Sequence, residues 1–186
     1  MKDSKQLTQK RREFLEQKIK EKAETFEVVI LHPIEIDGSE GNRIKLNELE
    51  AIACAKIINK INKGFKKLKI VLDCPSVSLV KWADYLKTKI KDLSNLEISC
   101  EHKADKNHVS VSAASILAKC VREKEMKALR EKYGEGLGSG YTSDPLTKKF
   151  LEKNHQKYEN DGIFRKTWIT WKRLRVNLSQ RKLGDF

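Results

Sequence analysis

Residues 101–125, EHKADKNHVSVSAASILAKCVREKE, combine a polar opening with a long amphipathic helical pattern. Apolar residues recur at steps of three and four and predict a helix with one buried face: Ala113, Ile116, Leu117, Cys120 and Val121. Polar side chains fall on the opposite side of this helix: Ser112, Ser115, Lys119 and Arg122. Hydroxyls and cations on one helix face, shortly after the acid Asp105, suit phosphate and a divalent metal. A surface helix with a solvated basic face is the alternative interpretation.

The chain before this helix alternates between short apolar runs and helical patterns. The apolar runs predict three strands: 26–36, 68–72 and 96–100. Pro33 would end the first of them or confine it to a sheet edge. The helical patterns predict three helices: 8–23, 47–64 and 77–93. This alternation predicts an α/β protein with parallel neighbouring strands, in which ligands bind at the carboxyl ends of the strands.

The charge of the chain bears on its partners. Its 186 residues carry a net charge of +13, and they are enough for one domain with a core and a short appendage. Such a surplus of cations favours nucleic acid as the partner, and a basic protein without a polyanion partner is the alternative. No run approaches the roughly 18 apolar residues of a membrane span, so no membrane partner is expected.

The cysteines bear on the compartment of the protein. They stand at Cys54, Cys74, Cys100 and Cys120, with no CxxC pair and no zinc-like spacing to histidine. Three of them lie in apolar runs, which favours buried, reduced thiols over a disulfide or zinc role. The N-terminal sequence also lacks the apolar region of a secretory signal. A cytoplasmic protein is therefore expected.

Two aspartates follow predicted strands. Asp73 closes the strand at 68–72 and Asp105 follows the strand at 96–100, so both are expected at one sheet edge. Carboxylates at such an edge suit Mg²⁺ or Mn²⁺, and a paired-metal site would need more than two of them. A helix cap or turn is the alternative role of Asp73. The other acids considered are interpreted as surface residues or as peripheral to the site: Asp37, Asp84, Asp92 and Glu123.

Two further segments have a composition that suits ligand contact. Residues 134–145, GEGLGSGYTSDP, form a glycine-rich loop whose backbone could approach a ligand closely, and a helix is expected from Pro145. Residues 164–174 interleave arginine and lysine with Trp168 and Trp171. Stacking or phosphate contact would use these aromatics, and packing of Trp168 on the protein body is the alternative.

Several of these blocks together resemble the ribonuclease HII family in its archaeal form. The matching stretches run in family order over nearly the whole chain: MKDSKQLTQKRRE, LNELEAIA, VLDCPS, EHKADKNHVSVSAASILAKCVRE, GSGYTSDP and RKTW. The resemblance implies a ribonuclease H-like mixed sheet flanked by helices. It also implies endonucleolytic, two-metal hydrolysis of the RNA strand of RNA–DNA hybrids, and of ribonucleotides embedded in DNA, with 5′-phosphate products.

The resemblance assigns roles by matching motif. Asp73 and Asp105 resemble two of the family's four carboxylate ligands of Mg²⁺ or Mn²⁺. Tyr141 resembles the tyrosine that stacks at the ribonucleotide. Five residues resemble those that contact the nucleic-acid backbone: Ser4, Lys5, Ser115, Lys119 and Arg122.

The chain departs from the family pattern at its start. It contains no Asp-Glu-Ala-Gly-Arg-Gly motif, so the first two strands and two metal carboxylates of the family are expected to be absent. A ribonuclease H-like domain is expected over 1–145 and a helical extension over 146–186. By itself the chain is expected to be inactive, with the missing N-terminal segment supplied in trans as one possibility. A non-catalytic hybrid-binding fragment, half of a split enzyme, and a structural subunit that docks an acidic protein are the alternatives.

Overall fold

The computed structural model describes residues 7–41 and 44–183. The chain forms two compact units, which are described in turn. The first consists of Met1–Ile30 and Lys45–Glu123, and the second of Leu31–Ile44 and Lys124–Phe186. The boundary expected after residue 145 stays a prediction.

The first unit contains two paired strands. β1 (Leu68–Asp73) and β2 (Leu96–Glu101) run parallel, in a register that places Leu68 beside Leu96 and Asp73 beside Glu101. Parallel strands need a crossover between them, and α4 (Leu79–Lys87) supplies it. The α/β class is therefore confirmed, and Asp73 and Glu101 mark the carboxyl edge of the pair.

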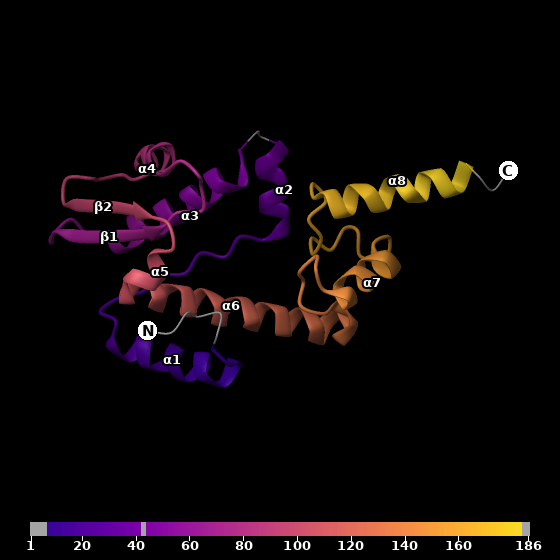
Figure 1. Ribbon diagram of the computed structural model, residues 1–186, viewed down its shortest axis with the longest axis horizontal. Coiled ribbons are helices and arrows are strands. Elements are labelled where there is room, and N and C mark those ends of the chain that lie inside the picture. Colours follow the sequence, from indigo (N-terminus) through magenta and orange to yellow (C-terminus); the bar gives the residue numbers. More distant parts are fainter. Residues whose placement is uncertain (1–6, 42–43, 184–186) are drawn as a thin grey trace. The chain divides into compact units, whose positions relative to one another are not determined.

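Helices α3 (Leu46–Ile61) and α4 bury their apolar faces with these strands (Figure 1). The shared core contains Ala51, Ala55, Ile58, Trp82 and Leu86. The first three recur at steps of four and three, so they form one stripe on α3. Trp82 is 4% exposed, and its indole N–H donates to the backbone oxygen of Asn47 at 2.7 Å, which satisfies its buried polar atom.

Three more helices belong wholly or partly to the first unit. They are α1 (Gln9–Lys22), α5 (Ala104–Asn107) and α6 (Val109–Tyr133), whose last turns continue into the second unit. Thr8 caps α1, as its hydroxyl accepts from the N–H of Arg11 at 3.3 Å. Arg12 of α1 forms an ion pair with Glu123 of α6. Glu123 therefore joins α6 to α1.

The prediction of a strand at 26–36 is wrong. Residues 25–32 form no regular element, and Pro33 begins α2 (Pro33–Gly41) instead of ending a strand. Proline suits a first helical position, and the backbone N–H of His32 donates to the Glu35 carboxylate at 2.9 Å, which stabilises the helix start. Within the described ranges, the only strand ladder is β1–β2, and the apolar run at 28–31 is not part of it.

The second unit is helical and packs around aromatic side chains. It contains α2, a short 3₁₀ turn (Glu135–Leu137), α7 (Pro145–Asn154) and α8 (Ile169–Leu183). Its aromatic cluster consists of Tyr133, Phe150, His155, Tyr158, Phe164 and Trp171. Trp171 is buried, and Trp168 is 37% exposed, with the guanidinium of Arg165 over its ring.

Asp37 differs from the surface residue that sequence analysis predicts. Its half-buried carboxylate accepts hydrogen bonds from the backbone N–H of Lys166 at 2.7 Å and from the hydroxyl of Thr167 at 2.6 Å. Asp37 thus ties α2 to the RKTW stretch before α8. Across the described ranges, no helix is both long enough and apolar enough to span a bilayer.

Candidate functional site

The carboxyl edge of the β1–β2 pair holds the two predicted aspartates on connected segments. Asp73 ends β1 with an exposed side chain, and its Oδ1 accepts a hydrogen bond from the backbone N–H of Ala104 at 3.2 Å. Ala104 is fully buried and directly precedes Asp105, which is half-buried in α5. The contact therefore fixes the end of β1 against the segment that carries the second aspartate.

Glu101 is a third acid at this edge, and the sequence did not single it out as a site residue. It lies beside Asp73 in the strand register, and its backbone oxygen accepts from the N–H of Cys74 at 2.9 Å. Its carboxylate is bound by His108 Nε2 at 2.9 Å and by the Ser99 hydroxyl at 3.0 Å. The hydrogen bond from His108, followed by that from Ser99, lowers the pKa of Glu101. Its oxygens are therefore engaged in holding the turn between β2 and α6.

Asp73 and Asp105 could supply part of the coordination shell of one hard divalent cation. Mg²⁺ is commonly bound through one or two carboxylates while waters and substrate phosphates complete its shell, which Asp73 and Asp105 can satisfy. Within the described ranges, no three His, Cys, Asp or Glu side chains gather as a metal site. A pair of ions would need more carboxylates than these two, because the close positive charges repel each other.

The polar face of α6 agrees with the prediction except at one position. Ser115, Lys119 and Arg122 are partly exposed, as expected of residues that could contact a backbone. Ser112, by contrast, is 2% exposed. It precedes Ile116 and Cys120 by four and eight residues, so it belongs to the buried row of the helix. Ser4 and Lys5 lie outside the described residues.

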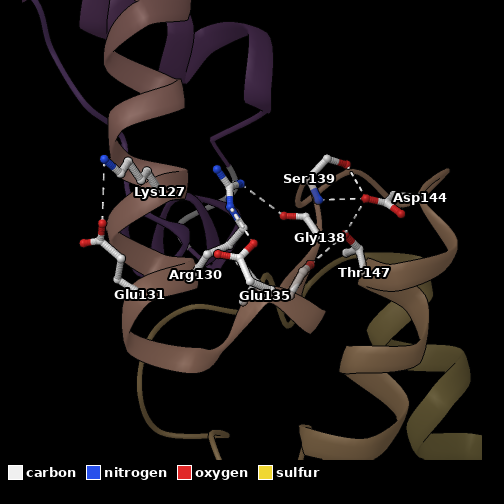
Figure 2. A network of polar contacts seen from close by, with 9 residues as sticks. Lys127, Arg130, Glu131, Glu135, Gly138, Ser139, Asp144 and Thr147 are labelled. Carbon is white, nitrogen blue, oxygen red and sulfur yellow. Dashed lines mark hydrogen bonds and ion pairs between the residues drawn. The ribbon is translucent and has the colours of Figure 1, made fainter.

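Tyr141 lies in the glycine-rich loop of the second unit, with its side chain 56% exposed. The loop around it contains two glycines with positive φ, Gly138 at 69° and Gly140 at 76°. Asp144 ends the loop and caps α7, since its Oδ1 accepts from the N–H of Leu146 at 2.9 Å. Figure 2 shows its carboxylate turned toward Ser139 of the same loop.

Asp144 is not among the site residues predicted from the sequence, although the sequence contains a signal for it. The pair Asp144-Pro145 is the N-cap and first-turn combination that starts many helices. The pKa of Asp144 is lowered to about 2, first by the hydroxyl of Ser139 and then by the backbone N–H groups of Ser139 and Leu146. Its carboxylate is therefore charged at any physiological pH.

The four cysteines are free thiols, as predicted. Burial raises the pKa of Cys54 to about 11 and also raises that of Cys100. Both side chains pack against the hydrophobic core of the first unit.

Known proteins resemble this chain along nearly all of its length. The family model described as Ribonuclease HII matches residues 1–171. A ribonuclease HII from Methanococcus maripaludis strain C7 is 42% identical over 186 residues, which is 98% of this chain and 75% of that protein. The crystal structure of the ribonuclease H2 from Pyrococcus horikoshii OT3 matches with a TM-score of 0.81 at 38% identity, over 94% of this chain and 80% of that chain.

A third relative was solved as a PCNA:RNase HII complex from Archaeoglobus fulgidus. It matches with a TM-score of 0.77 at 34% identity, over 93% of this chain and 79% of that chain. The ribonuclease H-like fold predicted from the motifs is thereby confirmed. With the family model and the curated relative in agreement, the chain belongs to the ribonuclease HII family.

Proposed function

We propose that the chain acts as a ribonuclease H, an endonuclease that hydrolyses the RNA strand of RNA–DNA hybrids and ribonucleotides embedded in DNA. One observation carries the proposal beyond family membership: Asp73 is bonded to the backbone that directly precedes Asp105. This arrangement brings two carboxylate-bearing segments to the carboxyl edge of a parallel strand pair, where α/β proteins bind their ligands.

Asp73 and Asp105 are the proposed ligands of Mg²⁺ or Mn²⁺. Bound divalent ions would polarise the phosphodiester and supply a hydroxide nucleophile at neutral pH. In the proposed reaction the fragment upstream of the cut ends in a 3′-hydroxyl and the downstream fragment begins with a 5′-phosphate. The protein holds the ligands in place: Ala104 orients the Asp73 carboxylate, and the Glu101–His108 contact holds the turn that contains Asp105. Two-metal action is part of this proposal and requires carboxylates in addition to these two.

Substrate contact is assigned to two further groups of residues. Ser115, Lys119 and Arg122, together with Ser4 and Lys5, contact phosphates without reading sequence. Tyr141 stacks at the ribonucleotide, where the 2′-hydroxyl distinguishes RNA from DNA. Its exposed ring and the partly exposed α6 cations support these roles.

A second candidate is a hybrid-binding protein without cleavage activity. One observation favours this candidate: among the described residues, no three His, Cys, Asp or Glu side chains come together as a metal site. Such a protein would use the basic face of α6 and Tyr141 in the same way, without turnover.

One experiment separates the two candidates. The purified chain is incubated with an end-labelled RNA–DNA hybrid, and with a DNA duplex containing one ribonucleotide, in Mg²⁺, Mn²⁺ or EDTA. Metal-dependent cuts with 5′-phosphate ends that disappear in Asp73→Asn support the enzyme, and they would overturn the expectation that the chain is inactive by itself. Tight binding of both substrates without a metal-dependent cut supports the binding protein. Equal affinity for these substrates and for a DNA duplex without any ribonucleotide would contradict both candidates.

The proposal includes a protein partner. The Archaeoglobus fulgidus relative was solved in a complex with PCNA, and PCNA is the proposed partner of this chain as well. Co-elution with the PCNA of its own organism in size-exclusion chromatography is the expected result. Separate elution at micromolar concentrations would contradict it.

A further inference from the structure

The loop that presents Tyr141 is held by a network of polar contacts at its far side. Asp144 Oδ2 accepts from the backbone N–H of Ser139 and from its hydroxyl, both at 2.7 Å. The same carboxylate also caps α7 through Leu146. One aspartate therefore fixes both the start of a helix and the loop segment just before Tyr141 (Figure 2).

Thr147 extends the network along the loop. Its hydroxyl donates to the backbone oxygen of Leu137 at 2.9 Å and accepts from the N–H of Gly140 at 3.0 Å. A threonine hydroxyl has one hydrogen and two lone pairs, so it can serve both partners at once. Thr147 thus joins the two ends of a four-residue stretch, 137–140.

The opposite side of this stretch is bound to α6. Arg130 Nη1 donates to the backbone oxygen of Gly138 at 3.4 Å, and its Nε lies 3.6 Å from the Glu135 carboxylate. A side chain at Gly138 would have no room, because its Cβ would lie 2.7 Å from Asp144 Oδ2 and 2.9 Å from Thr147 Oγ1. The loop backbone therefore packs directly on the two polar side chains of α7 and its cap.

This packing leaves little freedom for the residue that follows. Residues 137–140 each have a backbone atom held by Arg130, Asp144 or Thr147. Tyr141 comes next, and its ring is the exposed part of an otherwise fixed segment. A fixed loop presents an aromatic ring at little conformational cost on binding, which is the usual benefit of preorganisation.

We propose that Asp144 and Thr147 are positioning residues that hold Tyr141 ready to stack on a ribonucleotide. The inference rests on the proposed function, since it assigns to these residues the selectivity of the same site. They act through the loop and do not touch the substrate. Their loss should lower the preference for a ribonucleotide without removing the phosphate contacts of α6.

The test compares Thr147→Val with Thr147→Ser. Valine has nearly the shape of threonine but no hydroxyl, whereas serine keeps the hydroxyl and loses only a methyl group. Affinity is measured in EDTA for a duplex with one ribonucleotide and for the same duplex in DNA alone, so that no cleavage is involved. Thr147→Val should reduce the ratio of the two affinities about fivefold, which corresponds to about 1 kcal/mol. Thr147→Ser should retain the ratio.

A second readout reports on the loop itself. Hydrogen exchange at the Gly140 amide should become faster in Thr147→Val and stay slow in Thr147→Ser, because Thr147 is the acceptor of that N–H. Asp144→Asn offers a parallel variant, since asparagine still caps a helix but cannot accept both Ser139 donors.

The possible failures are distinct. A wild-type chain that binds both duplexes equally would overturn the proposed substrate of the site. A wild-type chain that prefers the ribonucleotide, with Thr147→Val keeping that preference, would overturn the positioning role alone. An unchanged Gly140 exchange rate in Thr147→Val would also overturn it, because the loop would then not depend on Thr147.

Discussion

The carboxylate of Asp73 and the backbone N–H of Ala104 are joined by a hydrogen bond of 3.2 Å. The donor belongs to the residue before Asp105, so this contact, which spans 31 residues of sequence, relates the two proposed metal ligands. It occupies Asp73 Oδ1, and in the proposed site Oδ2 would be the oxygen turned to the ion. The hydrogen bond thus orients the Asp73 carboxylate, and the negative charge of that carboxylate is what would attract the ion.

Asp73→Asn separates these two roles. The asparagine oxygen can still accept from Ala104, but the negative charge is lost, so the fold should persist while metal binding fails. Mutation of a residue that only hydrogen-bonds to a metal ligand typically weakens metal affinity by about 10- to 100-fold. Because Asp73 is itself a proposed ligand, we expect Mn²⁺ binding to weaken by about 100-fold or more. Mn²⁺ titration followed by electron paramagnetic resonance measures this directly.

Asp73→Ala is the matched comparison. It removes the hydrogen-bond acceptor as well as the charge, so it should also lower the free energy of unfolding by about 1 kcal/mol. Thermal unfolding without metal would show this difference between the two variants. Wild-type Mn²⁺ affinity in Asp73→Asn would exclude Asp73 as a ligand.

The cationic face of α6 should appear in the salt dependence of binding. Lys119→Ala and Arg122→Ala each remove one cation that is proposed to neutralise a phosphate, so hybrid affinity should fall for every sequence tested. The slope of log affinity against log salt should also become shallower by about one unit for each phosphate that is no longer neutralised. Fluorescence anisotropy at several salt concentrations gives both values.

Lys66→Ala is the control for charge alone. Lys66 lies just before β1, at the amino end of the strand, whereas the proposed site lies at the carboxyl end. It is exposed and pairs with Glu24 at 3.3 Å, so its loss removes one positive charge without disturbing the core. If Lys66→Ala changes the slope as much as Lys119→Ala does, the binding reflects net charge rather than the α6 face.

The parts of the fold that the sequence predicts correctly rest on local patterns. The strands at 68–72 and 96–100 are short apolar runs bounded by turn residues, and the structure extends each by one acid, Asp73 and Glu101. The long amphipathic helix ends at Tyr133, directly before Gly134. Hydrophobic periodicity and glycine at a helix end carry this information without any knowledge of tertiary contacts.

The predictions that were wrong concern residues whose structure depends on tertiary contacts. Residues 28–31 have strand-like composition, but a strand exists only with a hydrogen-bonded neighbour. Ser112 has a polar side chain in a buried row of α6, and Asp37 is held by residues about 130 positions later in the chain. Thr147, for which the sequence made no prediction, bonds to a loop whose path depends on glycines with positive φ. None of these partners can be read from the neighbouring sequence.

Asp144 should make the stability of the chain depend on acid pH. Its pKa is about 2, below the ordinary value of 3.8, so the folded state favours the charged form. The stabilising contribution is complete above about pH 4 and is lost as the pH falls from there through 2. The urea midpoint of the wild type should therefore drop more steeply over this range than that of Asp144→Asn. Parallel curves for the two proteins would show that the Ser139 contacts do not stabilise the charged carboxylate.

Asp37 should be a stabilising residue of the second unit. Asp37→Ala leaves three donors without their acceptor: the N–H groups of Lys166 and Thr167 and the hydroxyl of Thr167. Because the carboxylate is half-buried and charged, we expect a loss of about 2 kcal/mol in the free energy of unfolding. Urea unfolding followed by tryptophan fluorescence is a suitable measurement, since Trp168 and Trp171 lie next to this contact in sequence.

Asp84→Ala is the matched control, because sequence analysis assigns both aspartates to the surface and only Asp84 is found there. Its side chain is 66% exposed, and its ion pair with Lys87 is long at 3.9 Å. Such a pair contributes little, so the variant should stay within about 0.5 kcal/mol of the wild type. Equal losses in Asp37→Ala and Asp84→Ala would mean that the attachment of α2 to the RKTW stretch does not stabilise the unit. A larger loss in Asp37→Ala, partly recovered in Asp37→Asn, would show that the oxygen acceptor itself is what holds residues 166 and 167.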